Sequence, residues 1–223
     1  MNNIRHFELE IAELKRSLVN MGDLVGQSVH AAVDAIIHPR VDAREQARSI
    51  EERLDQMDTS IEERAHQIMA LQHPMVGDLR LLISALHICS DLEQIGDLAE
   101  SICKRATFIA KHSPVENPPN LSELGQQVRE MIRLCMESFV SPGLGLAKQV
   151  MELEDRTDTL TKSCYEAIQV SMAKAPERIR EYTHLLRAVA HLEHIGDIAV
   201  SIAEESVYIH HGQLIRHHHE DLA

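Results

Sequence analysis

The chain repeats itself at an offset of 100 residues, and this feature constrains its fold more than any other. Residues 92–99 read LEQIGDLA and residues 192–199 read LEHIGDIA. An earlier segment recurs as well, because residues 51–55 (EERLD) match residues 154–158 (EDRTD). Self-similarity over such a period predicts two copies of one supersecondary unit.

Apolar residues at helical spacing fill most of the chain between a few breakers. Aromatic residues make up only 3% of the sequence and Trp is absent, which is typical of helices rather than sheets. The breakers are Pro39, Pro74, the proline-rich stretch 113–120, Pro142-Gly143 and Pro176. Between them, helices are expected over residues 6–37, 41–72, 76–111, 121–139, 144–174 and 176–212.

The predicted fold class is therefore all-α, with two tandem, pseudo-symmetric three-helix bundles. A chain of 223 residues is long enough for two small domains with their own cores. The first repeat is assigned to residues 1–112, the linker to 113–120 and the second repeat to 121–212. A histidine-rich tail, which includes His217, His218 and His219, occupies residues 213–223.

The formal charge of −13 argues against a nucleic-acid partner, which needs a clustered cationic surface, and favours cations or basic protein surfaces. No apolar run of about 18 residues is present, and the N-terminus lacks the apolar stretch of a signal peptide. We therefore expect a cytoplasmic protein without membrane insertion. Four cysteines without a Cys-x-x-Cys pair predict reduced core thiols: Cys89, Cys103, Cys135 and Cys164.

Each half contains two Glu-x-x-x-Asp motifs, and such a motif places two carboxylates one turn apart on the same helix face. Acidic pairs of this kind are common on solvated helix faces, so a single motif is a weak indication of function. The eight motif carboxylates are Glu51, Asp55, Glu93 and Asp97 in the first half and Glu154, Asp158, Glu193 and Asp197 in the second.

The spacing of the motifs around the turns strengthens the case for a site. In an antiparallel hairpin, residues equidistant from the turn lie at the same height. The first two motifs centre on residues 53 and 95, and their midpoint falls on Pro74. The other two centre on residues 156 and 195, with a midpoint at Ala175-Pro176. Four carboxylates are thus expected to converge in each half, about 30 Å from the turn at about 1.5 Å per residue.

Four converging carboxylates repel one another, and bound cations that prefer oxygen ligands, such as Mg²⁺, Mn²⁺, Fe or Ca²⁺, would relieve this repulsion. Raised carboxylate pKa values or Lys and Arg side chains would also offset the repulsion. Arg53 and Arg156 are the candidate counter-charges, but a shift of two positions turns them toward another helix face. Metal binding is therefore favoured over a solvated face. Gly96 and Gly196 precede the motif Asp in both copies, either for close helix packing or to give a ligand room.

These motifs resemble the PhoU family over nearly the whole chain. The resemblance is carried by residues 92–99 and 192–199, by the paired Glu-x-x-x-Asp motifs, and by HPMVGDLR at residues 73–80. It departs at the second turn, where ERIR at residues 177–180 replaces that last segment. The resemblance implies two three-helix bundles, multinuclear iron, zinc, manganese or magnesium sites on the acidic motifs, and a homodimer.

The resemblance also implies a function in phosphate signalling. Members of the family link the Pst phosphate transporter, through its ATPase subunit, to a membrane sensor kinase. They hold the phosphate-starvation response off when phosphate is plentiful. On this basis the chain is expected to be a metal-binding negative regulator of phosphate transport.

Two other functions stay open. Glu63 with His66, and Glu181 with His184, have the Glu-x-x-His spacing of ferritin-like di-iron carboxylate proteins, although they lie in opposite halves. A metal-free helical adaptor of another phosphate carrier is the second alternative. The sequence shows no nucleophile with a base, no phosphate-binding loop and no coenzyme fingerprint, so no catalytic activity is predicted.

Overall fold

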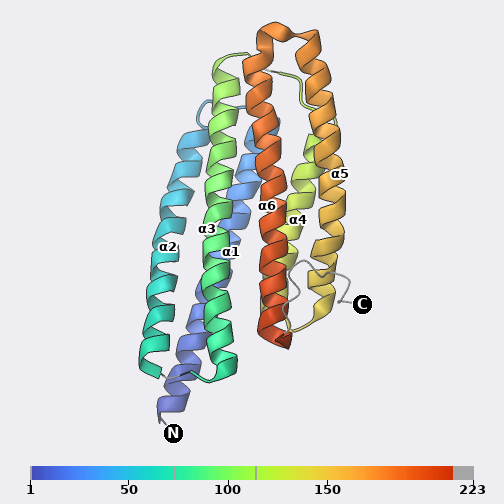
Figure 1. The fold of residues 1–223 in the computed structure, drawn as a ribbon. Helices are drawn as coiled ribbons and strands as arrows, with labels where there is room; N and C mark the ends of the chain where they lie inside the picture. The colour runs from blue at the N-terminus through green and yellow to red at the C-terminus, as the bar shows by residue number, and fades with distance from the viewer. Residues whose placement is uncertain (1, 73, 114, 213–223) are drawn as a thin grey trace.

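The computed structural model describes residues 2–72, 74–113 and 115–212, and this part of the chain contains long helices and no strand (Figure 1). The predicted all-α class is confirmed. The elements are α1 (Asn2–Ile37), α2 (Ala43–Gln72), α3 (Val76–Lys111), α4 (Leu121–Val140), α5 (Leu144–Lys174), a 3₁₀ turn η1 (Pro176–Arg178) and α6 (Ile179–His211).

The last helix begins differently from the prediction. Pro176 opens the 3₁₀ turn, and α6 begins only at Ile179. Proline suits the first position of such a turn, because its missing N–H would have no helical acceptor there. The helix ends at His211 and is capped by Gly212, whose φ of 71° is left-handed and whose N–H donates to the carbonyl of Tyr208 at 2.9 Å.

The helices form two three-helix bundles, α1–α3 and α4–α6, with α2 and α5 at the outer edges (Figure 1). The central helices α3 and α6 lie side by side and run antiparallel. Polar contacts join Asp91 to Ser201 at 3.0 Å, and Gln94 to His194 at 3.2 Å. Since Gln94 and His194 are equivalent in the repeat, the pseudo-two-fold axis that relates the halves passes between them.

The same pseudo-symmetry relates α1 to α4 through two glycines. A Cβ at Gly22 would lie 2.6 Å from Cε of Met136, and a Cβ at Gly125 would clash with Val33. Both partners are equivalent at an offset of 103 residues, so each half inserts one glycine under a bulky side chain of the other. The close approach of α1 and α4 therefore requires Gly at both positions.

The core is built from residues that the repeat makes equivalent. Leu92, Ile95, Leu192 and Ile195 are all fully buried, which places the inner face of each central helix in one continuous core. All four cysteines are buried and free, as predicted. None of the described helices combines the length and the apolar character that a membrane crossing needs.

Candidate metal centres

The first acidic cluster lies at the seam between α2 and α3. Glu51 and Asp55 stand one turn apart on α2, and Glu93 and Asp97 stand one turn apart on α3. In both motifs the Glu is half-buried and the Asp is exposed. The carboxylates thus lead from the edge of the packed seam out to solvent, as a cation site open on one side requires.

The two motifs face each other closely enough to perturb each other's protonation. Burial raises the pKa of Glu93 above its ordinary value, and the negative charges of Asp97 and then of the α2 carboxylates raise it further. Burial also raises the pKa of Asp97, followed by the charge of Asp55. The pKa of Glu51 is raised by burial and then by the charges of Glu100 and Asp55. The motif carboxylates of the first half therefore lie close enough to influence one another's charge.

Two further carboxylates belong to this cluster and were missed by the sequence reasoning. Asp58 raises the pKa of Glu93, and Glu100 raises the pKa values of Glu51 and Asp97. Each lies three residues after a motif Asp and therefore continues the same helix face by one turn. That spacing was the signal in the sequence that would have identified them. Asp58 also accepts a hydrogen bond from the Cys89 thiol, with Sγ and Oδ1 3.2 Å apart.

Arginines from the start of α2 partly compensate the first cluster. Nε of Arg44 lies 3.2 Å from Oε1 of Glu100, and Arg48 lowers the pKa of Glu51 as the smallest of its influences. Arg53 and Arg156, the counter-charges considered from the sequence, form no ion pair with the motif carboxylates within the described residues. Arg156 pairs with Glu123 of α4, and Arg53 lines a separate cavity with Ser17, Asn20, Gln56, Met57, Ser60 and Ile61. Their predicted orientation toward another face is therefore correct.

The second cluster, at the seam between α5 and α6, repeats the half-buried Glu and exposed Asp. Burial raises the pKa of Asp158, and the charges of Asp197 and Asp155 raise it further, so the two motif aspartates face each other. Glu193 is held by the Tyr165 hydroxyl, which donates to Oε2 at 3.0 Å. Nδ1 of His194 lies 3.6 Å from Oδ2 of Asp197. Neutral and basic groups therefore contact this cluster directly.

The glycines before the motif aspartates differ in how closely the neighbouring helix approaches them. A Cβ at Gly96 would lie 2.5 Å from Cδ1 of Leu54, whereas a Cβ at Gly196 would lie 3.4 Å from Cγ2 of Thr157. Both glycines are buried and contact the neighbouring helix of their own hairpin. Close helix packing, one of the two explanations left open by the sequence, therefore accounts for Gly96. It does not account for Gly196, where a Cβ would make only ordinary contacts.

The donor set of both clusters fits a hard cation. All eight motif groups are carboxylates, which suit Mg²⁺, Mn²⁺ and iron, and the repulsion among them is what a cation would relieve. As placed, no three His, Cys, Asp or Glu side chains within residues 2–72, 74–113 and 115–212 close around one point as the ligands of a single ion do. Loading would therefore require rotation of the exposed aspartates, whose side chains have solvent on one side.

The Glu-x-x-His pairs do not converge. Glu63 and His66 are exposed on α2, whereas Glu181 is buried on α6 and His184 stacks on Phe108 at 3.8 Å between ring centroids. In Figure 1, α2 and α6 lie on either side of α3. The predicted tail histidines His217, His218 and His219 lie outside the described residues.

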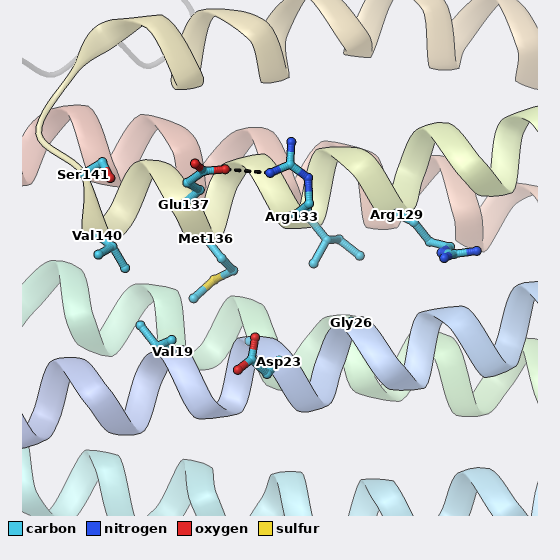
Figure 2. Close-up of a pocket in the computed structure, with 11 residues that line it drawn as sticks. Val19, Asp23, Gly26, Arg129, Arg133, Met136, Glu137, Val140 and Ser141 are labelled. Atoms are coloured by element: carbon cyan, nitrogen blue, oxygen red, sulfur yellow. Dashed lines mark hydrogen bonds and ion pairs between the residues drawn. The ribbon is translucent and has the colours of Figure 1, made fainter.

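A groove of about 410 Å³ lies on another part of the surface, along the line where α1 meets α4 (Figure 2). It is lined by Val19, Gly22, Asp23, Gly26, Arg129, Ile132, Arg133, Met136, Glu137, Val140 and Ser141. The Arg133 guanidinium is already paired, with Nη1 2.6 Å from Oε2 of Glu137 and Nη2 2.7 Å from Oε1 of Glu130. None of the motif carboxylates lines this groove, so it is separate from both acidic clusters.

A duplicated helical bundle with an acidic cluster in each hairpin defines a class of all-helical protein with two copies of one domain. The family described as "PhoU domain" matches the chain twice, at residues 18–106 and 121–206, and the chain belongs to the PhoU family. A relative from Aquifex aeolicus, named a phosphate-specific transport system accessory protein PhoU homolog, is 30% identical over 210 residues, covering 94% of this chain and 95% of that protein.

Two solved structures are similar to the whole fold. The crystal structure of PhoU from Pseudomonas aeruginosa has a TM-score of 0.86 at 31% identity, covering 93% of this chain and 100% of that chain. The phosphate transport system regulatory protein PhoU from Streptococcus pneumoniae has a TM-score of 0.84 at 27% identity, covering 93% and 98%. These similarities support the pairing of two PhoU domains described above.

Proposed function

We propose that this chain is a cation-binding accessory protein that negatively regulates phosphate transport and the phosphate-starvation response. The observation that carries the cation-binding part is the convergence of carboxylates at the α2–α3 seam, where three motif groups have raised pKa values. The regulatory part rests on family membership and on relatives named as accessory or regulatory proteins of phosphate transport.

In this proposal Glu51, Asp55, Glu93 and Asp97 hold cations in the first half. The equivalent Glu154, Asp158, Glu193 and Asp197 hold them in the second half. Iron, zinc, manganese and magnesium are the metals to test. A bound ion would supply positive charge that neutralises the seam and ties the two helices of each hairpin together. The chain's own groups hold the ion and shape the surface beside it, and no catalytic turnover is proposed.

The proposed partners are the ATPase subunit of the Pst transporter and the phosphate sensor kinase, which the chain would link in the cytoplasm as a homodimer. Deleting the gene in a strain without a second copy tests this regulatory function. Phosphate-starvation genes should then be expressed at high phosphate. Normal repression in the deletion strain would contradict regulation through the sensor kinase. Altered phosphate uptake with normal repression would instead favour the adaptor of another phosphate carrier.

Elemental analysis separates the metal-binding protein from a metal-free adaptor. The protein should be purified without a nickel column, since histidines outside the clusters could retain nickel. We expect bound metal in the wild type and a clear loss in the Asp97→Asn, Asp197→Asn double variant. The Glu63→Gln, Glu181→Gln variant serves as the matched control. Loss of metal from that control, with the aspartate variant unaffected, would instead support the di-iron alternative.

A further inference from the structure

A cluster of basic side chains lies where the C-terminal part of α3 meets the N-terminal part of α6. Its members, called here the arginine–histidine cluster, are Arg105 of α3, His112 directly after α3, and Arg180, His184, Arg187 and His191 of α6. The two helices run antiparallel at this point, so six basic groups from two distant segments meet at one end of the central helix pair.

Direct contacts and shared electrostatics hold the cluster together. Nη2 of Arg105 donates to Nε2 of His191 at 3.1 Å, which requires an unprotonated acceptor nitrogen. Phe108 stacks with His112 at 4.0 Å and with His184 at 3.8 Å between ring centroids. These contacts fix the positions of the side chains before any ligand arrives, which lowers the entropy cost of binding.

The positive charges in this cluster are not compensated. In the described part of the chain, no ion pair joins Arg105, Arg180 or Arg187 to a carboxylate, whereas Arg44 and Arg64 each have one. Burial lowers the pKa of Arg105, and the charge of Arg187 lowers it further. The chain has a formal charge of −13, so the lack of carboxylate partners for these arginines does not result from a shortage of acidic residues.

The imidazole of His184 responds to the same repulsion. Burial and the charge of Arg105 lower the pKa of His184. Nε of Arg105 and Nδ1 of His184 are also buried without a hydrogen-bond partner in the described residues. Mutual repulsion and unpaired polar atoms are what an added anion would relieve.

We propose that the arginine–histidine cluster is a binding site for a small oxyanion of the phosphate class. Guanidinium groups present planar forks of donors that match phosphate oxygens. A dianion gains more than a monoanion from several uncompensated arginines at one place. This inference rests on the cluster alone, and it does not depend on metal binding or on the regulatory function proposed above.

Titration with inorganic phosphate tests the site in full-length protein that has been treated with chelator, so that phosphate cannot bind through a metal on the acidic clusters. We expect saturable binding by calorimetry and ³¹P line broadening. Affinity should fall by roughly tenfold or more in Arg187→Gln and in Arg105→Gln, because each loses a charge-assisted contact. Arg129→Gln makes the same charge change on α4 and should bind like the wild type.

Acetate at the same ionic strength should not compete with phosphate, because it carries a single charge. The Arg187 side chain is exposed, so its replacement leaves the core intact and melting curves can verify folding of each variant. Absence of phosphate binding in the presence of chelator would overturn the proposal. Equal weakening in Arg187→Gln and Arg129→Gln would overturn it too, since binding would then reflect net charge alone. Binding of an acidic peptide without binding of phosphate would reassign the surface to a protein partner.

Discussion

Each acidic cluster has four motif carboxylates at equivalent positions, but the residues that surround them differ between the two clusters. At equivalent positions, Asp58 of the first cluster corresponds to Thr161, Glu100 to Val200, and Glu62 to Tyr165. Arg44 and Glu100 form an ion pair in the first half, whereas the equivalent residues of the second half are Ala147 and Val200. The first cluster is thus more acidic and is compensated from its edge, whereas the second has fewer charges.

This difference shows that the duplication kept the carboxylates and changed the way in which their repulsion is handled. Burial and neighbouring charges raise the pKa values of Glu51, Glu93 and Asp97 in the first cluster. In the second cluster, Tyr165 donates to Glu193 and His194 lies beside Asp197. We therefore expect the first half to depend more strongly on bound cations than the second.

The largest expected contrast concerns the residues packed beneath the motifs. Leu54 is 1% exposed, so Leu54→Ala should lower the free energy of unfolding by about 2–5 kcal/mol through lost burial and a cavity. The equivalent Thr157→Ala removes a hydroxyl that donates to the Leu153 carbonyl at 2.9 Å, and should cost about 1 kcal/mol. Urea unfolding of both variants measures this. Equal losses would show that the two seams are packed alike.

Replacement of Gly96 and Gly196 by Ala should change the stability of the protein in different directions. Gly96→Ala gains about 1 kcal/mol of helix propensity but overpacks the buried Leu54 side chain by about 1–3 kcal/mol, so the variant should be less stable. Gly196→Ala meets its nearest neighbour at 3.4 Å, an ordinary contact, and should be as stable as the wild type or more stable. Thermal melting of the two variants in chelator tests this. Stabilisation of both would mean that Leu54 moves aside freely.

Tyr165→Phe should make the second cluster resemble the first, because Glu193 then loses its hydrogen-bond donor. It removes the hydrogen bond to Glu193, and we expect a loss of about 1 kcal/mol in the free energy of unfolding. Burial and this bond raise the pKa of Tyr165, so the hydroxyl stays protonated and donates at neutral pH. Tyr208→Phe is the control, because that hydroxyl makes no hydrogen bond within the described residues. Equal effects in the two variants would argue that Tyr165 does not restrain Glu193.

The smallest expected effect is the pH dependence of the first cluster. A carboxyl whose folded pKa is raised contributes stability below its unfolded value, 4.5 for Glu93, and loses it as the pH rises through the folded value. In chelator, Glu93→Gln should therefore become more stable relative to wild type between pH 4.5 and 7. The gain should stay below about 1 kcal/mol because solvent screens the site. Glu63→Gln, at an exposed position of α2 outside the motifs, is the matched control.

The helices and the hairpins could be predicted from the sequence because both depend on local signals. Pro74 and Pro176 mark the turns, and the motif spacing on each side of them places the carboxylates at one height. The pairing of α3 with α6 could not be predicted, because it depends on contacts such as Gln94 with His194 between segments 100 residues apart. The repeat showed that two units exist, without showing how they pack.

The limits of the sequence reasoning were similar at the site. The orientation of Arg156 followed correctly from its position on the helix, since it pairs with Glu123 rather than with the motif carboxylates. Asp58 and Glu100 were missed because only the repeated motif was followed, and neither residue is repeated in the second half. The close packing at Gly96 depends on the side-chain conformation of Leu54, which no local pattern specifies.

The central claim is that the acidic clusters are crowded without a cation and are stabilised by one. Melting curves of wild type and Asp97→Asn, each in chelator and with Mn²⁺, test it most directly, with Asp23→Asn on α1 as the control. Asn removes one charge at nearly constant shape, so Asp97→Asn should melt higher than wild type in chelator. It should gain less from Mn²⁺, whereas the wild type should gain about 2.7 kcal/mol at 100 times its dissociation constant. If Asp97→Asn melts no higher than wild type in chelator and responds equally to Mn²⁺, Asp97 is neither crowded nor a ligand, and the cluster is a solvated helix face.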